Sequence, residues 1–218
     1  MKIITFYADC DLPEQPRRKQ EGFDWRQAIG WLRNSAAKQG YETLVVTDSK
    51  TDIDAWLRVG DAKASGLMLW ILEAQAEAIR SADGPCVMVS PDSLVMGSLD
   101  MLIGAWDVSI LTRAKPKPIV NSVIGFRPSD RLHRLWLDVL ETARRLPKES
   151  QEWGADIDAL VDRLDIRPME SGVRNVEDVK VRLLPMDSVF TSVRDVAPKT
   201  PIWDFKGNRK QKMHRFVS

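Results

Sequence analysis

The sequence has few of the residues that would cross-link the chain or anchor it in a membrane. Its 218 residues include only two cysteines, Cys10 and Cys86, which give no disulfide framework and effectively exclude a metal site built on several thiolates. No apolar run approaches the ~20 residues of a membrane span, and the amino-terminal stretch turns polar too soon for a signal peptide. We therefore expect a cytoplasmic protein in a reducing compartment, without a membrane span.

An excess of charge of one sign is also missing. The 32 Lys and Arg residues almost balance the 31 Asp and Glu residues, which leaves a formal net charge of +1. This balance argues against general binding to nucleic acid or to a membrane surface through the overall field of the protein. The sequence has no internal repeat and no low-complexity tract. Its length and its 44% of hydrophobic residues fit one domain with a sizeable core, which we expect over residues 1–218.

The first half of the chain alternates short buried strands with amphipathic helices. Asp24 is a potential helix cap, and the apolar residues after it recur at three- and four-residue steps until Gly40. Strands are expected at 3–7, 44–48 and 86–90, and helices from Asp24 to Gly40 and at 67–79. This alternation is typical of an α/β fold with a mostly parallel central sheet flanked by helices.

The second half continues the alternation less regularly. Ser129 or Asp130 can cap a long amphipathic helix. We further expect a short helix at 99–105, strands at 107–112, 119–126 and 179–183, and a helix at 155–164. The segments 165–178 and 185–201 are polar, and we expect them to be loops.

The segment from Cys86 to Leu99 is the first candidate for a functional site. The buried run Cys86 to Ser90 stops at Pro91, which cannot donate a hydrogen bond to a sheet, and the carboxylate Asp92 follows at once. In open α/β sheets, ligands bind at the carboxyl ends of the strands. A turn-forming Pro-Asp pair would explain the same residues. Both interpretations stay open from this segment alone.

Two segments together resemble the GT-A fold glycosyltransferases of the glycogenin and lipopolysaccharide galactosyltransferase type. One is Ser90-Pro91-Asp92 followed by an apolar run and Gly97-Ser98-Leu99, where the family has Asp-x-Asp and Gly-x-Leu. The other is Asp204-Phe205-Lys206-Gly207-Asn208-Arg209-Lys210, where the family has His-Phe-x-Gly-x-x-Lys. The resemblance implies a single GT-A-like domain over 1–218, in which 202–218 closes over a diphosphate.

The resemblance also assigns roles to other positions. Tyr7, Ala8 and Asp9 match the segment that contacts the nucleoside, and Ser90 joins the donor-binding residues. Asn121-Ser122 matches a loop that contacts the donor sugar, although Val123 replaces the family's glycine. Asp156 and Asp158 match the catalytic acids, with Ile157 where the family has glutamine. Placement at a helix amino terminus would also explain these two acids, and a backbone turn would explain Asn121.

The carboxy-terminal segment has a chemical rationale of its own. A diphosphate concentrates negative charge, so its site needs cations and closely approaching backbone amides. Lys206 and Lys210 supply ammonium groups, and Gly207 lets the backbone approach. Asp204 and Asp92 can supply oxygen ligands to Mn²⁺ or Mg²⁺, although Ser90 stands where the first metal-binding acid is expected. A solvated basic tail is the competing interpretation.

These observations favour a glycosyltransferase that moves a hexosyl or pentosyl group from a nucleoside diphosphate sugar, most readily a UDP-sugar, to an acceptor hydroxyl. The sequence does not identify the acceptor, and a nucleic acid is one possibility. The alternatives are a non-catalytic or nucleic-acid-associated relative, including a modifier of nucleic-acid bases, and a sugar nucleotidyltransferase. The last lacks support, because Ala8-Asp9-Cys10-Asp11 offers no glycine-rich loop after the first strand.

Overall fold

The computed structural model describes residues 1–8, 23–48, 63–114, 117–146, 154–193 and 199–217, and its centre is a seven-stranded sheet in the order β2-β1-β3-β6-β5-β8-β7. Five strands run in one direction, whereas β6 and β7 run antiparallel to their neighbours. The expected α/β fold with a mostly parallel central sheet is confirmed. The strands are β1 (Lys2–Ala8), β2 (Glu42–Asp48), β3 (Cys86–Val89), β5 (Val108–Thr112), β6 (Ile119–Phe126), β7 (Gly172–Val176) and β8 (Val179–Pro185).

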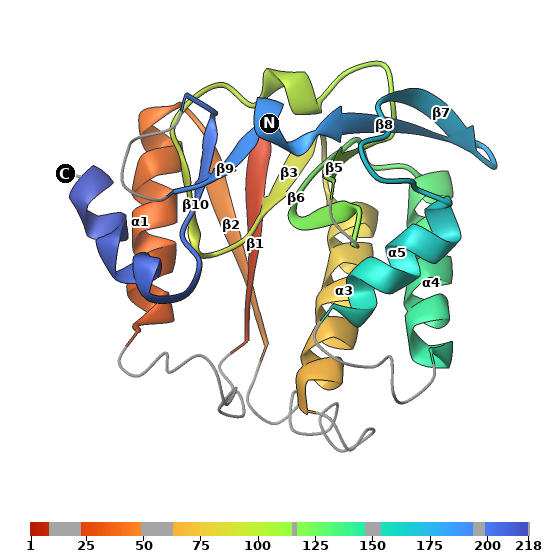
Figure 1. The fold of residues 1–218 in the computed structure, drawn as a ribbon, viewed down its shortest axis with the longest axis horizontal. Coiled ribbons are helices and arrows are strands. Elements are labelled where there is room, and N and C mark those ends of the chain that lie inside the picture. Colours follow the sequence, from red (N-terminus) through yellow and green to blue (C-terminus); the bar gives the residue numbers. More distant parts are fainter. Residues whose placement is uncertain (9–22, 49–62, 115–116, 147–153, 194–198, 218) are drawn as a thin grey trace.

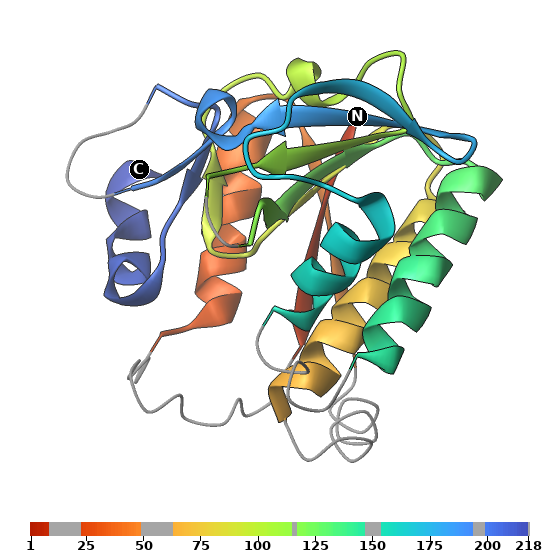
Figure 2. The ribbon, with the colours of Figure 1, turned by 45° about the vertical axis from the view of Figure 1, so that its right-hand side comes forward.

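Helices cover both faces of this sheet (Figure 1). Helix α1 (Trp25–Lys38) packs on one face through Leu32 and Ala36. Helices α3 (Lys63–Ser81), α4 (Asp130–Arg145) and α5 (Ala155–Leu164) lie side by side on the other face, where they form the larger core (Figure 2). None of the described helices is long and apolar enough to cross a bilayer.

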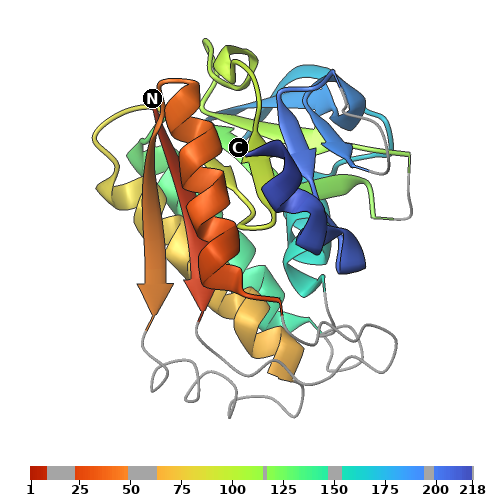
Figure 3. The same ribbon diagram turned by 90° about the vertical axis from the view of Figure 1, so that its left-hand side faces the viewer.

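A small second sheet joins the carboxy-terminal segment to the central motif. Its strands are β4 (Ser93–Val95), β10 (Ile202–Asp204) and β9 (Phe190–Ser192), in the order β4-β10-β9. The 3-10 helix η4 (Gly207–Phe216) follows and lies beside α1 (Figure 3). Phe205 and Met213 are fully buried between these elements and α1. The carboxy-terminal segment is therefore a packed part of the domain over its described residues.

Most element boundaries follow from local sequence signals. Asp24 caps α1 by accepting hydrogen bonds from the backbone N–H groups of residues 26 and 27, and Gly40 follows the helix at a φ of 80°. Ser129, the first of the two expected candidates, caps α4 by accepting from the backbone N–H of Leu132. The expected helix at 99–105 is only one 3-10 turn, η1 (Asp100–Leu102).

The two segments expected to be polar loops contain regular structure, so that expectation was wrong. Strand β7 lies within 165–178, at the edge of the sheet and antiparallel to β8. Its residues alternate between half-buried and exposed, so its polar composition resembles that of a loop. The segment 185–201 contains the short 3-10 helix η3 (Met186–Ser188) and β9. Strand β9 has only three residues and pairs with β10 outside this segment, so the local sequence shows no period that would reveal it.

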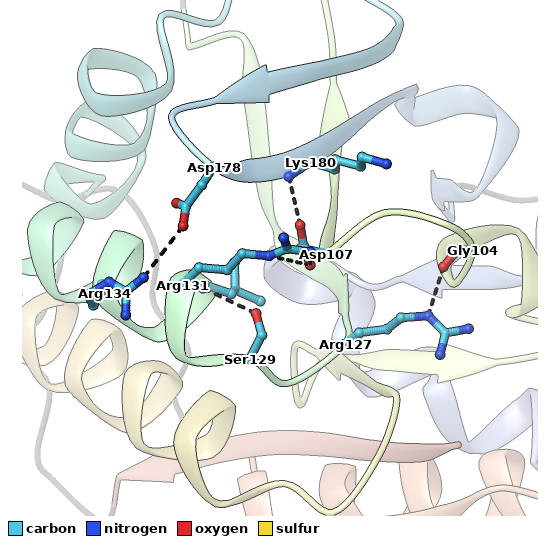
Figure 4. A network of polar contacts seen from close by, with 9 residues as sticks. Gly104, Asp107, Arg127, Ser129, Arg131, Arg134, Asp178 and Lys180 are labelled. Carbon is cyan, nitrogen blue, oxygen red and sulfur yellow. Dashed lines mark hydrogen bonds and ion pairs between the residues drawn. The ribbon is translucent and has the colours of Figure 1, made fainter.

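Asp107 joins three elements at the amino ends of β5 and β8 (Figure 4). Its buried carboxylate accepts hydrogen bonds from Nε and Nη2 of Arg131 on α4, at 3.1 and 2.7 Å. The second carboxylate oxygen accepts from the backbone N–H of Lys180 at 2.7 Å. The backbone carbonyl of Asp107 accepts from the N–H of Arg127 at 2.8 Å. One carboxylate thus fixes the position of α4 against the sheet.

Removal of this carboxylate should be costly, because the partly buried N–H of Lys180 and the guanidinium of Arg131 both lose their acceptor. We expect Asp107→Ala to lower the free energy of unfolding by about 3 kcal/mol. Asp178→Ala is the matched control, since Asp178 contacts Arg134 at 3.5 Å in an exposed ion pair (Figure 4) and should contribute less than about 1 kcal/mol. Urea denaturation of both variants measures the difference, and equal losses would contradict this interpretation.

Candidate functional site

The structure brings Asp92 and Asp204 together just beyond the carboxyl end of β3. Pro91 ends the strand, and the chain turns into β4, which pairs antiparallel with β10 so that Asp204 lies opposite Ser93. The backbone N–H of Phe205 donates to the carbonyl of Asp92 at 3.0 Å. The two motifs that carried the sequence resemblance, far apart in the chain, are therefore neighbours in space.

Asp92 is engaged by both of its carboxylate oxygens. Oδ1 accepts a hydrogen bond of 2.5 Å from the hydroxyl of Ser90, and Oδ2 lies 3.1 Å from the ammonium of Lys210. Lys210 is only 6% exposed, and its ammonium lies 3.8 Å from the ring centroid of Trp25 and 5.7 Å from that of Phe23. The carboxylate of Asp92 and the two aromatic rings together offset the free-energy cost of removing the Lys210 ammonium from water.

Asp204 has a different environment, because it is fully buried and only partly satisfied. Its Oδ2 accepts a hydrogen bond from the hydroxyl of Ser192 at 3.3 Å and lies 3.8 Å from the ammonium of Lys206. Its Oδ1 has no hydrogen-bond partner among the described residues. Burial, and then the negative charge of Asp92, raise the pKa of Asp204 to about 7.

The raised pKa gives a pH dependence with a definite sign. Between about pH 4 and 7, Asp204 binds a proton in the folded protein but not in the unfolded chain, so stability falls as the pH rises through this window. Asp204→Asn removes this dependence. We compare the free energy of unfolding of the variant with that of the parent. We expect the difference in favour of the variant to be larger at pH 8 than at pH 4 by on the order of 2–4 kcal/mol. Urea denaturation at several pH values measures the gain, and parallel stability curves for the two proteins would contradict it.

A second set of polar side chains, Asn121 and Asp156, is connected to Ser90 through strand β6. The backbone N–H of Ser90 donates to the carbonyl of Ser122 at 2.9 Å. The pairing of β5 with β6 shifts register around Asn121 and Ser122, which lets Asn121 donate a hydrogen bond from Nδ2 to Asp156 on α5. Asn121 Oδ1 and Asp156 Oδ1 are buried and have no hydrogen-bond partner among the described residues. Such atoms are candidates for contact with a ligand.

The two acids of α5 have separate environments. Asp156 is buried, and burial raises its pKa despite the hydrogen bond from Asn121. Asp158 is about one third exposed and forms an ion pair with Lys117, whose ammonium lies 2.8 Å away and also donates to the carbonyl of Gly154 at 3.2 Å. Since residues two apart on a helix point in different directions, Asp156 is the acid held beside Asn121.

Other sequence expectations have mixed outcomes. Tyr7 and Ala8 end β1, which is parallel to β3, so they lie at the same edge of the sheet as the site. Asp9 lies outside the described residues. Sequence reasoning missed four contributors: Phe23 and Trp25 beside Lys210, Ser192 beside Asp204, and Lys117 beside Asp158. Phe23 lies two residues before α1 and Trp25 is its first residue. Nothing in the local sequence indicates that these rings contact a lysine from the other end of the chain.

The residues present fit a divalent cation poorly. Proteins hold Mg²⁺ or Mn²⁺ mainly through several oxygen ligands, carboxylates above all. Among the described residues, no group of three or more His, Cys, Asp or Glu side chains converges on one point. Asp92 and Asp204 do meet, but Asp92 is already engaged by Ser90 and Lys210. A metal at Asp92 and Asp204 thus stays a prediction, and an experiment below tests it.

A further group of cationic side chains lies at the amino ends of the strands, away from this site. A cavity of about 420 Å³ is lined by Arg127, Arg131 and Lys180 together with Trp106 and Asp107. It lies at the amino ends of β5 and β8, whereas Asp92 follows the carboxyl end of β3. Asp107 neutralises part of this surface through Arg131, so the cavity has fewer free cations than its lining implies.

Comparison with known proteins finds no likeness in sequence but a clear one in fold. No protein-family model matches the chain, and no match is found among curated proteins. Among solved structures, a glycosyltransferase involved in glycosylation of the major capsid of PBCV-1 has a TM-score of 0.59 at 10% identity, covering 99% of this chain and 98% of that one. The galactosyltransferase LgtC, solved with donor and acceptor sugar analogues, has a TM-score of 0.55 at 11% identity, covering 100% and 95%.

A third neighbour is larger than this chain. The glycosyltransferase GlyE of Streptococcus pneumoniae matches at a TM-score of 0.55 and 10% identity over 99% of this chain, which spans 60% of the length of GlyE. These neighbours are glycosyltransferases of the GT-A type. At such low identity the comparison concerns the fold. The chain therefore has the GT-A glycosyltransferase fold that the sequence resemblance implied.

Proposed function

We propose that the protein transfers a sugar from a nucleoside diphosphate sugar, most readily a UDP-sugar, to an acceptor hydroxyl. The observation that carries the proposal is that two lysine–carboxylate pairs lie beyond the carboxyl end of β3, while strand β6, hydrogen-bonded to Ser90 through Ser122, carries the buried Asn121–Asp156 pair. Open α/β sheets bind their ligands at this edge. The fold adds support, since the neighbours in structure are glycosyltransferases.

Lys206 and Lys210 would act on the diphosphate. When the bond between the anomeric carbon and the diphosphate oxygen breaks, negative charge collects on the leaving group. Ammonium groups already fixed in place stabilise this charge without reorganisation. Gly207 lies between the two lysines in the chain and has no side chain to obstruct the approach of phosphate oxygens to the backbone.

Asn121 and Asp156 would act on the sugar. Each has one buried side-chain oxygen without a partner among the described residues, and sugar hydroxyls are suitable donors to such atoms. As the bond to the leaving group breaks, the acceptor oxygen bonds to the anomeric carbon and loses its proton. Asp156 and Asp158 are the candidate groups that orient the sugar and accept this proton.

A thermal-shift screen of nucleoside diphosphates and their sugars, with and without Mn²⁺, tests the proposal. Binding at a concentration of 100 Kd adds about 2.7 kcal/mol of stability, which corresponds to an increase in Tm of about 5–10 °C for a chain of this size. We expect one nucleoside diphosphate to raise the Tm selectively, and its monophosphate to have a much smaller effect. Flat responses to every compound would contradict the proposal and favour a non-catalytic relative.

A further inference from the structure

Lys210 lies where a divalent cation would otherwise contact Asp92. Its ammonium is 3.1 Å from Asp92 Oδ2, and the other oxygen of that carboxylate accepts from Ser90. A cation bound to Asp92 would need several oxygen ligands, yet it would meet a hydroxyl donor and an ammonium group. Like charges this close repel strongly where water is excluded. The environment of Asp92 therefore opposes a metal ion.

Lys210 is also held in this position from its other side. The ring of Trp25 lies 3.8 Å from the ammonium, and Trp25 packs edge-on against Phe23 with ring centroids 5.1 Å apart. The aromatic faces attract the ammonium, which adds to the attraction of Asp92. Displacement of Lys210 by a metal would break the contact of its ammonium with Trp25 and its ion pair with Asp92.

Each of the two carboxyl groups of the site has an ammonium group beside it. Asp92 and Asp204 supply two carboxyl groups, and Lys210 and Lys206 supply two ammonium groups at 3.1 and 3.8 Å. The two ammonium groups carry the same total charge as one divalent cation. An ammonium has three donors, and the contact with Asp92 uses only one of those of Lys210. Lys206 is half-exposed, so its ammonium is open to phosphate oxygens, whereas Lys210 is buried and would act through its charge.

We propose that Lys210, assisted by Lys206, takes the place of the divalent cation, so that the protein binds a nucleoside diphosphate without metal. This inference rests on the proposed function, because it concerns the same diphosphate. It competes with the sequence-based prediction that Asp92 and Asp204 hold Mn²⁺ or Mg²⁺. The two assignments differ in the metal dependence of nucleotide binding.

Isothermal titration of the full chain with UDP, in EDTA and then in MnCl₂ or MgCl₂, distinguishes them. We expect the Kd to agree within about twofold between the conditions. Binding that appears only with a metal, or strengthens at least tenfold with it, would overturn this inference and leave the proposed function intact. Absence of binding by UDP and by every other nucleoside diphosphate under both conditions would overturn both.

Lys210→Met tests the role of the ammonium itself. We expect it to weaken UDP binding in EDTA at least tenfold, since it removes a charge while preserving most of the side-chain volume. Lys180→Met is the matched control, because Lys180 lies at the opposite edge of the sheet, and it should leave the Kd unchanged. Unchanged binding by a folded Lys210→Met would overturn the inference.

Lys206→Gln provides a second test if Lys210→Met fails to fold. Lys206 is half-exposed, so its replacement is compatible with folding. We expect severalfold weaker UDP binding in EDTA, and no recovery when MnCl₂ is added. Recovery with MnCl₂ would show that a metal ion supplies the missing charge, and it would overturn the inference.

Discussion

Asp156→Asn is expected to lower donor turnover at least about 100-fold while it raises the stability of the protein. The amide keeps the size of the carboxyl group but cannot accept a proton or carry negative charge beside the sugar. Burial raises the pKa of Asp156, so its ionised form destabilises the fold, and stability declines as the pH rises through that pKa. The gain in stability should therefore be largest at alkaline pH.

Release of nucleoside diphosphate from the donor measures turnover, and calorimetry at pH 5 and pH 8 measures stability. Asp162→Asn is the control, since Asp162 is an exposed acid of the same helix and should change neither quantity appreciably. The opposite signs of the two effects are the distinctive result, because an ordinary structural lesion lowers both. Unchanged turnover in Asp156→Asn would exclude a catalytic role for this residue.

Asp92→Asn is expected to lower the free energy of unfolding by about 3 kcal/mol, because it leaves the ammonium of Lys210 buried without its counter-ion. Addition of Lys210→Met to this variant should recover much of the loss, since the double variant has no uncompensated charge there. The resulting double-mutant cycle should give a coupling energy of at least about 2 kcal/mol by urea denaturation.

The pair of Lys2 and Asp83 is a matched control for this cycle. Its ammonium and carboxylate are 2.9 Å apart, similar to the distance between Lys210 and Asp92, but both side chains are exposed. We expect a much smaller coupling energy than for Asp92 and Lys210, because water screens the exposed pair. Equal coupling in the two cycles would show that burial does not strengthen the contact between Asp92 and Lys210.

The sequence identified the site best where a local signal coincided with a motif. The buried run ending at Pro91 placed Asp92 at the end of a strand, and the spacing from Asp204 to Lys210 marked the segment that returns to it. The structure confirms that Asp92 and Asp204 are neighbours. These features depend on residues close in the chain, for which composition and spacing are informative.

Contacts between distant segments could not be predicted in the same way. Trp25 begins a helix and Lys210 lies near the carboxyl terminus, so no local pattern links them. Strand β7 was missed because an exposed edge strand has the composition of a loop. The sequence already showed Ser90 in the position of the first expected metal-binding acid. Its meaning for metal binding becomes clear only from the position of Lys210 beside Asp92. Only the fold shows that a lysine lies where a metal was expected.

A crystal structure of the protein grown with UDP in EDTA would test the central claim most directly. The claim is that a diphosphate binds between the carboxyl end of β3 and the carboxy-terminal segment. The expected result is density for both phosphates beside this segment, with a phosphate oxygen within hydrogen-bond distance of the ammonium of Lys206 and the diphosphate next to the buried Lys210. Density for the phosphates at Arg127 and Lys180, at the opposite edge of the sheet, would contradict it.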